Sequence, residues 1–118
     1  MSCHDLIENL RKAYRENCLE ARVKHYSKYK VLIIDEIGYL PIDKLGANLF
    51  FQLITNHYEN TSTIITTNQP FGKWGDVFSD ITLANSILER LLHHSHIIKI
   101  VGSSYRTKDI MDLMNELQ

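Results

Sequence analysis

This 118-residue chain has few of the features that mark secreted, metal-binding or membrane proteins. Its two cysteines, Cys3 and Cys18, fit no metal-site spacing and are expected to be reduced thiols. No apolar run approaches the roughly 20 residues of a membrane helix, and residues 1–5 lack the basic and apolar regions of a signal peptide. The net charge is −1, so no excess of one sign points to a nucleic-acid or membrane partner. These absences predict a globular protein of the cytoplasm.

The periodicity of apolar residues predicts one α/β domain. We expect helices over residues 3–22, 43–58 and 82–93 and a short helix from Thr107, with Ser2 and Asp43 capping the first two. Apolar runs predict strands at 31–35, 63–67 and 97–101, the first of them covered on both faces. Residues 23–29 read as a polar connection and residues 70–80 as an ordered loop. Strands that alternate with helices indicate a parallel sheet.

Two adjacent carboxylates, Asp35 and Glu36, directly follow the apolar run at 31–34. Burying an unpaired carboxylate is costly, so both are expected at the exposed end of the strand, where open α/β sheets bind ligands. Four apolar residues before Asp-Glu form the Walker B pattern of nucleoside triphosphatases. In that interpretation Asp35 holds Mg²⁺ through water and Glu36 polarises the attacking water. The alternative is an acidic turn after a core strand.

Three further polar residues could complete such a site. Asn68 ends the next predicted strand and would orient water against a γ-phosphate; alternatively it only stops the strand before Gln-Pro. Arg90 and Arg106 carry guanidinium groups of the kind that stabilise charge in phosphoryl transfer, in trans if a neighbouring subunit supplies them. Otherwise Arg90 is a solvated or salt-bridged helix residue and Arg106 a surface residue of a turn.

Three local clusters could bind ligands, and for the first two we favour a structural explanation. The histidines within residues 93–96 follow a helix and would splay apart, which suits the helix dipole better than a metal. The aromatic side chains within residues 71–78 could stack on bases, but packing of the loop explains them. The lysines and tyrosines within residues 24–30 form a small basic patch that could touch DNA in an assembled ring.

In combination, five segments of the chain closely resemble the C-terminal part of IstB-like ATP-binding proteins. They are residues 31–40 (VLIIDEIGYL), 62–71 (STIITTNQPF), 74–78 (WGDVF), 87–93 (ILERLLH) and 104–106 (SYR). These proteins are AAA+ ATPases that assist insertion-sequence transposases and are related to DnaC-type helicase loaders. The resemblance implies that residues 1–118 are a single, partial AAA+ P-loop NTPase domain of about three strands flanked by helices.

The same resemblance implies a role for each candidate residue. Asp35 and Glu36 correspond to Walker B, Asn68 to sensor 1, Arg90 to the arginine-finger region and Arg106 to sensor 2. It also implies ATP and Mg²⁺ as cofactors, with oligomerisation on DNA and engagement of a transposase or a replicative helicase in the full-length protein.

The chain departs from the family because it has no P-loop. None of its five glycines begins the pattern Gly-x-x-x-x-Gly-Lys-Ser/Thr, whose amides and lysine hold phosphates. We therefore expect a C-terminal fragment, a truncated gene or an expressed half-domain, without tight ATP binding or ATPase activity by itself. The alternative function is an inert self-association or interaction module.

The missing part also affects the sheet. In the AAA+ strand order 5-1-4-3-2, the fifth strand normally borders the first, which this chain lacks. We expect residues 97–101 either to pair with residues 63–67 or to exchange with another copy of the chain, since exposed strand edges favour association.

Overall fold

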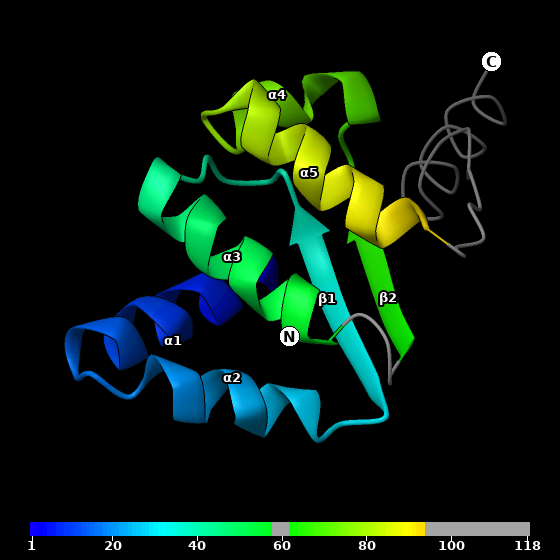
Figure 1. Ribbon diagram of the computed structural model, residues 1–118. Coiled ribbons are helices and arrows are strands. Elements are labelled where there is room, and N and C mark those ends of the chain that lie inside the picture. Colours follow the sequence, from blue (N-terminus) through cyan, green and yellow to red (C-terminus); the bar gives the residue numbers. More distant parts are fainter. Residues whose placement is uncertain (58–61, 94–118) are drawn as a thin grey trace, which may run out of the picture.

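The computed structural model describes residues 1–57 and 62–93 of the chain. In order, the elements are α1 (Cys3–Arg15), α2 (Leu19–Ser27), β1 (Val31–Ile37), α3 (Lys44–His57), β2 (Ser62–Thr67), η1 (Phe71–Lys73), α4 (Trp74–Val77) and α5 (Ile81–Leu92). The alternation of helices and strands is the predicted α/β arrangement (Figure 1). The predicted strand at 97–101 and the helix from Thr107 lie outside the described residues.

The first predicted helix, over residues 3–22, is wrong because the chain turns after α1. Asn17 has a φ of 56°, a left-handed conformation that asparagine tolerates better than most residues. The amide of Cys18 donates to the carbonyl of Ala13 (2.8 Å), the six-to-one bond of a Schellman-type helix end. A second helix, α2, then runs through the segment expected to be a polar connection.

The helix caps predicted from sequence are present. The Ser2 hydroxyl accepts a hydrogen bond from the Asp5 amide at 3.1 Å, which caps α1. The Asp43 carboxylate accepts one from the Gly46 amide at 2.9 Å, at the start of α3. Each cap sets the residue at which its helix, α1 or α3, begins.

The described sheet has two parallel strands, with Ile33 paired to Ile64 and Ile34 to Ile65. The first residues of the chain add an isolated bridge, because Ser2 pairs with Asp35 on the edge of β1 away from β2. The Met1 carbonyl there accepts a hydrogen bond from the Asp35 amide at 2.9 Å. The strands predicted at residues 31–35 and 63–67 are thus neighbours in a parallel sheet, and β1 continues to Ile37.

Only one face of the sheet is covered by the described elements. Leu32 and Ile34 are buried, whereas Val31, Ile33 and Ile64 are 48%, 47% and 51% exposed. Figure 1 shows the reason: α1, α2 and α3 lie on the same side of the strands. The expectation that the first strand would be covered on both faces is thus wrong for the described residues.

The core lies between the covered face and the helices. On α3 it includes Leu49, Phe50, Leu53 and Ile54, whereas Leu45 of the same helix is 39% exposed. The predicted loop at residues 70–80 contains the short helices η1 and α4.

The aromatic side chains of that segment pack onto the domain. Trp74 and Phe78 are almost fully buried, and the Phe78 ring stacks on Phe50 at 5.6 Å between centroids. Phe71 remains 38% exposed beside Trp74. Packing therefore explains the two buried aromatic residues better than base stacking does.

Candidate functional site

The two adjacent carboxylates lie on a β-bulge at the carboxyl end of β1. Ile34 pairs with Ile65 and Ile37 with Thr67, so Asp35 and Glu36 together stand opposite one residue, Thr66. Glu36 has a φ of 66°, which is uncommon for a residue other than glycine. Bulges re-aim side chains at sheet ends and next to active sites. Here the bulge leaves the Asp35 side chain half-buried and the Glu36 side chain exposed.

Thr66 contacts both members of the bulge through its hydroxyl. The Glu36 amide donates to Thr66 Oγ1 at 3.1 Å. Thr66 Oγ1 in turn donates to Asp35 Oδ1 at 3.2 Å. One side chain of β2 therefore links the carboxylate of one residue to the backbone of the next.

Asn68 follows β2 at the same end of the sheet as the carboxylates. A Cβ added at Gly38 would lie 3.5 Å from Asn68 Oδ1 and 2.6 Å from Gln69 Cγ, so these side chains sit against the turn after β1. Gly38 has a φ of +94°, which accounts for glycine at this position. Thr67 joins the two strand ends, since its hydroxyl donates to the Ile37 carbonyl at 2.6 Å and accepts from the Gln69 amide at 3.1 Å.

The structure thus brings three of the five predicted site residues to one sheet edge. Asp35, Glu36 and Asn68 come from neighbouring parallel strands whose carboxyl ends meet there. Arg90 lies in the last turn of α5 with an exposed side chain. Arg106 lies outside the described residues.

The donor atoms at this edge suit a hard divalent cation. Carboxylate and amide oxygens are Mg²⁺ ligands, and Mg²⁺ usually keeps several waters and binds one or two carboxylates together with substrate phosphates. Residues 1–57 and 62–93 contain no group of three or more His, Cys, Asp or Glu side chains that could enclose a metal ion. Asp35 and Glu36 therefore fit a hydrated ion shared with a ligand better than a closed protein metal site.

A pocket of about 310 Å³ opens beside Glu36. One wall comes from α1 and the other from the segment that follows β1. The lining residues are Cys3, His4, Ile7, Glu8, Arg11, Glu36, Gly38, Tyr39, Leu40, Pro41 and Ile42. Glu36 therefore borders a space large enough for water or a ligand group.

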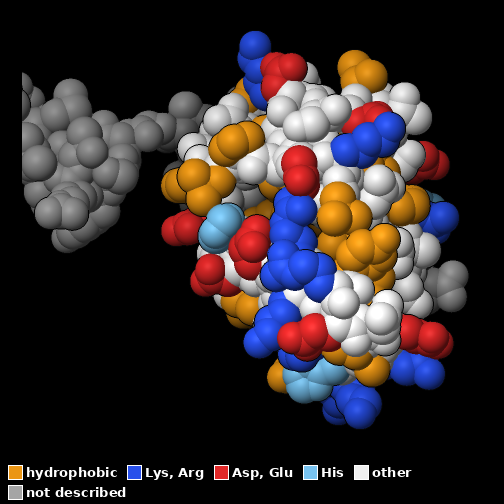
Figure 2. All heavy atoms as spheres, turned by 90° about the vertical axis from the view of Figure 1, so that its left-hand side faces the viewer, with side chains coloured by type: hydrophobic (Ala, Val, Ile, Leu, Met, Phe, Trp, Pro, Cys, Tyr) orange, Lys and Arg blue, Asp and Glu red, His pale blue; other side chains and the backbone are white. Residues whose placement is uncertain are grey.

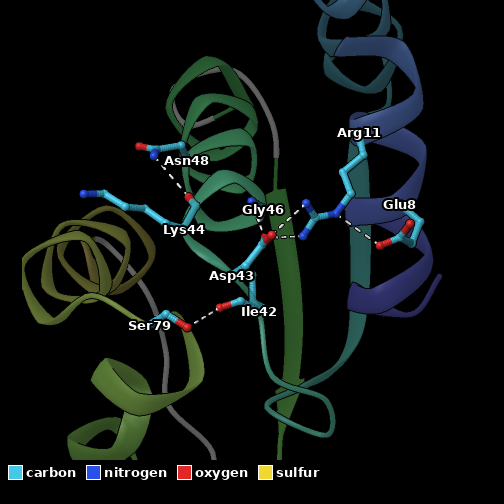
Figure 3. Close-up of polar contacts among 8 residues, drawn as sticks. All are labelled: Glu8, Arg11, Ile42, Asp43, Lys44, Gly46, Asn48 and Ser79. Atoms are coloured by element: carbon cyan, nitrogen blue, oxygen red, sulfur yellow. Dashed lines mark hydrogen bonds and ion pairs between the residues drawn. The ribbon is translucent and has the colours of Figure 1, made fainter. Parts of the chain in front are cut away.

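A polar network that the sequence did not predict holds the second wall in place (Figure 3). The Arg11 guanidinium binds both oxygens of Asp43, with 3.1 Å from Nη1 to Oδ2, and its Nε donates to Glu8 Oε1 at 3.1 Å. The Arg11 hydrogen bond, followed by that from the Gly46 amide, lowers the pKa of Asp43 below its usual value. The Ser79 hydroxyl also donates to the Ile42 carbonyl at 2.7 Å. The segment between β1 and α3 is therefore tied to α1 on one side and to the end of α4 on the other.

These contacts join residues far apart in the sequence. Arg11 and Asp43 are 32 positions apart, so no local sequence pattern predicts that they pair. A glycine at position 46, inside a helix, is the one sequence signal that could have suggested close packing. A Cβ added there would lie 2.6 Å from Arg11 Nη2.

The lysines of the predicted basic patch around residues 24–30 are exposed, but only one of its two tyrosines is. Lys24, Lys28 and Lys30 are exposed, and Tyr29 is 49% exposed, whereas Tyr26 belongs to the core at 6%. On the face shown in Figure 2, Lys and Arg side chains are interspersed with acidic and apolar ones. The charge on that face is of mixed sign.

Among the described helices, none combines the length and the apolar character needed to cross a bilayer.

Comparison with known proteins identifies the family. The model of the IstB-like ATP binding protein family matches residues 1–112. An insertion sequence IS232 protein of Bacillus thuringiensis subsp. berliner, named for ATP binding, is 59% identical over 116 residues, which are 98% of this chain and 46% of that protein. A similarly named IS21 protein of Pseudomonas aeruginosa is 50% identical over 104 residues, covering 88% of this chain and 39% of its own length. The chain thus spans less than half the length of these curated relatives.

Solved structures give the fold. DnaA from Aquifex aeolicus, with AMPPCP bound, superposes with a TM-score of 0.66 at 16% identity over 98% of this chain and 35% of that one. DnaI superposes with a TM-score of 0.63 at 18% identity, covering 82% and 54%. These likenesses concern the fold alone, and they confirm the predicted partial α/β domain of the AAA+ P-loop fold. The chain belongs to the IstB-like ATP-binding protein family.

Proposed function

We propose that this chain is the Walker B-bearing portion of an AAA+ protein that binds and hydrolyses ATP while assisting DNA transposition. The observation that carries the proposal is the bulge that presents Asp35 and Glu36 beside Asn68 at the carboxyl edge of the sheet. Ligands bind at that edge in open α/β sheets. The family match and the insertion-sequence relatives support the biological setting.

Each side chain would have a separate role at this edge. Asp35, half-buried and hydrogen-bonded by Thr66, would hold the hydrated Mg²⁺ that accompanies ATP and neutralises charge on its phosphates. Glu36 is exposed at the pocket and would polarise the attacking water. Asn68 would orient that water through its amide.

The arginines would act on developing phosphate charge. Arg90 would serve as an arginine finger toward a neighbouring subunit and Arg106 as a sensor 2 residue, as the family positions imply. The guanidinium group suits this task because it stays charged and binds phosphate oxygens in a fork. Hydrolysis would require a phosphate-cradling P-loop, which the 118 residues of this chain do not contain.

The partners proposed for the full-length protein follow from the family. They are a transposase or a replicative helicase, DNA, and further copies of the protein in an oligomer, all in the cytoplasm. The insertion-sequence relatives and the fold shared with DnaA and DnaI support this set.

A chimera tests the proposal directly. Residues 1–118 would replace the matched region of the IS232 relative, and Mg²⁺-dependent phosphate release would be compared with that of the intact relative. We expect the chimera to release phosphate, and Asp35→Asn or Glu36→Gln to reduce the rate at least about a hundredfold, the lower range for a residue in proton transfer. A folded chimera whose rate is unchanged by either substitution would refute these roles.

A second function has an observation of its own in its favour. Val31, Ile33 and Ile64 form an exposed apolar strip on the open face of the sheet, which suits a module that associates with itself or with intact homologues. Light scattering at increasing concentration would show a rising mass, and less so for Ile33→Thr. A mass that stays monomeric at high concentration would count against this alternative.

A further inference from the structure

Thr66 is placed to control both carboxylate-bearing residues although neither the motif nor the fold requires its hydroxyl. Its side chain is exposed, on the open face of the sheet that it shares with Ile64. A β-branched side chain suits a strand at this position, and valine would meet that need as well as threonine does. The hydroxyl therefore needs an explanation beyond strand formation.

The direction of its two hydrogen bonds can be derived. A backbone N–H can only donate, so Thr66 Oγ1 must accept from Glu36 at 3.1 Å. The single hydroxyl hydrogen is then available for Asp35 Oδ1 at 3.2 Å, which can only accept when ionised. Both functions of one hydroxyl are thus used on two consecutive residues of the bulge.

These bonds act on the two properties that matter at the site. The bond to Glu36 supports a backbone conformation, φ 66°, that a non-glycine residue rarely adopts without help from its surroundings. The bond to Asp35 fixes a carboxylate whose backbone is already held from the other side by the Met1 carbonyl. A carboxylate has about four lone-pair sites, so one hydrogen bond at Oδ1 leaves acceptor capacity for the waters of a hydrated cation.

We propose that Thr66 is a positioning residue that orients the Asp35 carboxylate toward a hydrated divalent cation and maintains the bulge at Glu36. This inference rests on the proposed role of Asp35 at the metal. Outer partners that orient a metal-binding carboxylate typically change metal affinity by about ten- to a hundredfold when they are lost.

Two substitutions separate the hydroxyl from the rest of the side chain. Thr66→Val keeps the shape and removes the hydroxyl, whereas Thr66→Ser keeps the hydroxyl and removes the methyl. Thr63→Val is the matched control, because it makes the same chemical change in the same strand before the bulge. Circular dichroism would establish that each variant folds.

The measurement is NMR of the full chain, with Mn²⁺ as a paramagnetic probe since carboxylates bind it much as they bind Mg²⁺. We expect Mn²⁺ to broaden the amide signals around Asp35 in the wild type, in Thr66→Ser and in Thr63→Val. In Thr66→Val the apparent affinity for Mn²⁺ should fall about tenfold, and the Glu36 amide should exchange with solvent about fivefold faster or more, as expected from losing one hydrogen bond.

Each other outcome is decisive. Wild-type Mn²⁺ affinity together with wild-type Glu36 exchange in Thr66→Val would overturn the inference, and so would a Thr66→Ser variant that behaves like Thr66→Val. Absence of broadening near Asp35 in the wild type would instead refute the metal role on which the inference rests. In that case the exchange of the Glu36 amide still decides whether Thr66 holds the bulge.

Discussion

The two faces of strand β1 are built from similar residues and have opposite surroundings. Leu32 and Ile34 point into the core and are 6% and 0% exposed, whereas Val31 and Ile33 on the other face are 48% and 47% exposed. An apolar run of this kind is typical of a strand covered on both faces. The comparison shows that β1 is apolar on both faces, although the described helices cover only one of them.

The largest effect should come from truncating the covered face. Ile34→Ala removes methyl groups from a fully buried site and should lower the free energy of unfolding by about 2–5 kcal/mol. The matched change Ile33→Ala, one residue earlier on the open face, should cost less than about 1 kcal/mol. Urea unfolding followed by circular dichroism would compare the two. Equal losses would mean that the open face is packed in solution.

The second-largest loss of stability is expected at Gly38, in the turn that follows β1. Gly38→Ala should cost about 1–2 kcal/mol, because an L residue is strained at a φ of +94°. The added Cβ would also push Gln69 aside at 2.6 Å. Gly72→Ala is the control, since its Cβ would meet nothing within 4 Å. If both variants unfold at the same urea concentration, the turn after β1 does not require glycine at position 38.

A smaller loss of stability is expected at Asp43, which binds Arg11 of α1 and caps α3. Asp43→Ala removes the cap of α3 and should cost about 1 kcal/mol. Asp43→Asn retains a capping side chain and removes the charge, so it should cost a few tenths of that, because the exposed Asp43 carboxylate of the pair with Arg11 is screened by solvent.

The Asp43 variants also predict a pH dependence. The pKa of Asp43 is lowered in the folded state, so its contribution is present above the ordinary value of 3.8 and is lost as the pH falls through the folded pKa. Urea unfolding between pH 6 and pH 2 should therefore show a shallower acid-side decline in Asp43→Asn than in the wild type. Parallel curves for the two proteins would contradict the lowered pKa.

The smallest perturbation probes the covered side without a mutation. Burial raises the pKa of the Cys3 thiol to about 12, and Cys3 is 2% exposed. Since the thiolate is the reactive form, a thiol reagent at pH 8 should modify Cys3 far more slowly in the folded chain than in urea. Mass spectrometry after timed labelling, with half-buried Cys18 as the internal comparison, measures this. Rapid labelling of Cys3 without denaturant would mean that α1 does not stay on the sheet.

Local chemistry made part of this structure predictable. Ser2 and Asp43 cap helices because of their own side chains, and Asn68 lies near the carboxylates because parallel strands end at one edge. Asn17 could have been recognised as a left-handed helix end, but the apolar periodicity that continues past it predicted one unbroken helix over residues 3–22.

Other features depend on contacts between distant residues. The bulge at Glu36 is supported by Thr66, 30 positions away, and the pocket wall by Arg11 and Asp43, 32 positions apart. The exposure of Val31 and Ile33 depends on which elements are present to cover them, which the strand sequence does not encode.

The central claim is that this chain carries the carboxylates of an ATPase site without the groups that cradle the phosphates. Phosphate release from ATP and Mg²⁺ by the purified chain, compared with an Asp35→Asn, Glu36→Gln double variant, tests it most directly. The account predicts that both proteins release phosphate at the same background rate. Release by the wild-type chain that disappears in the double variant would contradict it.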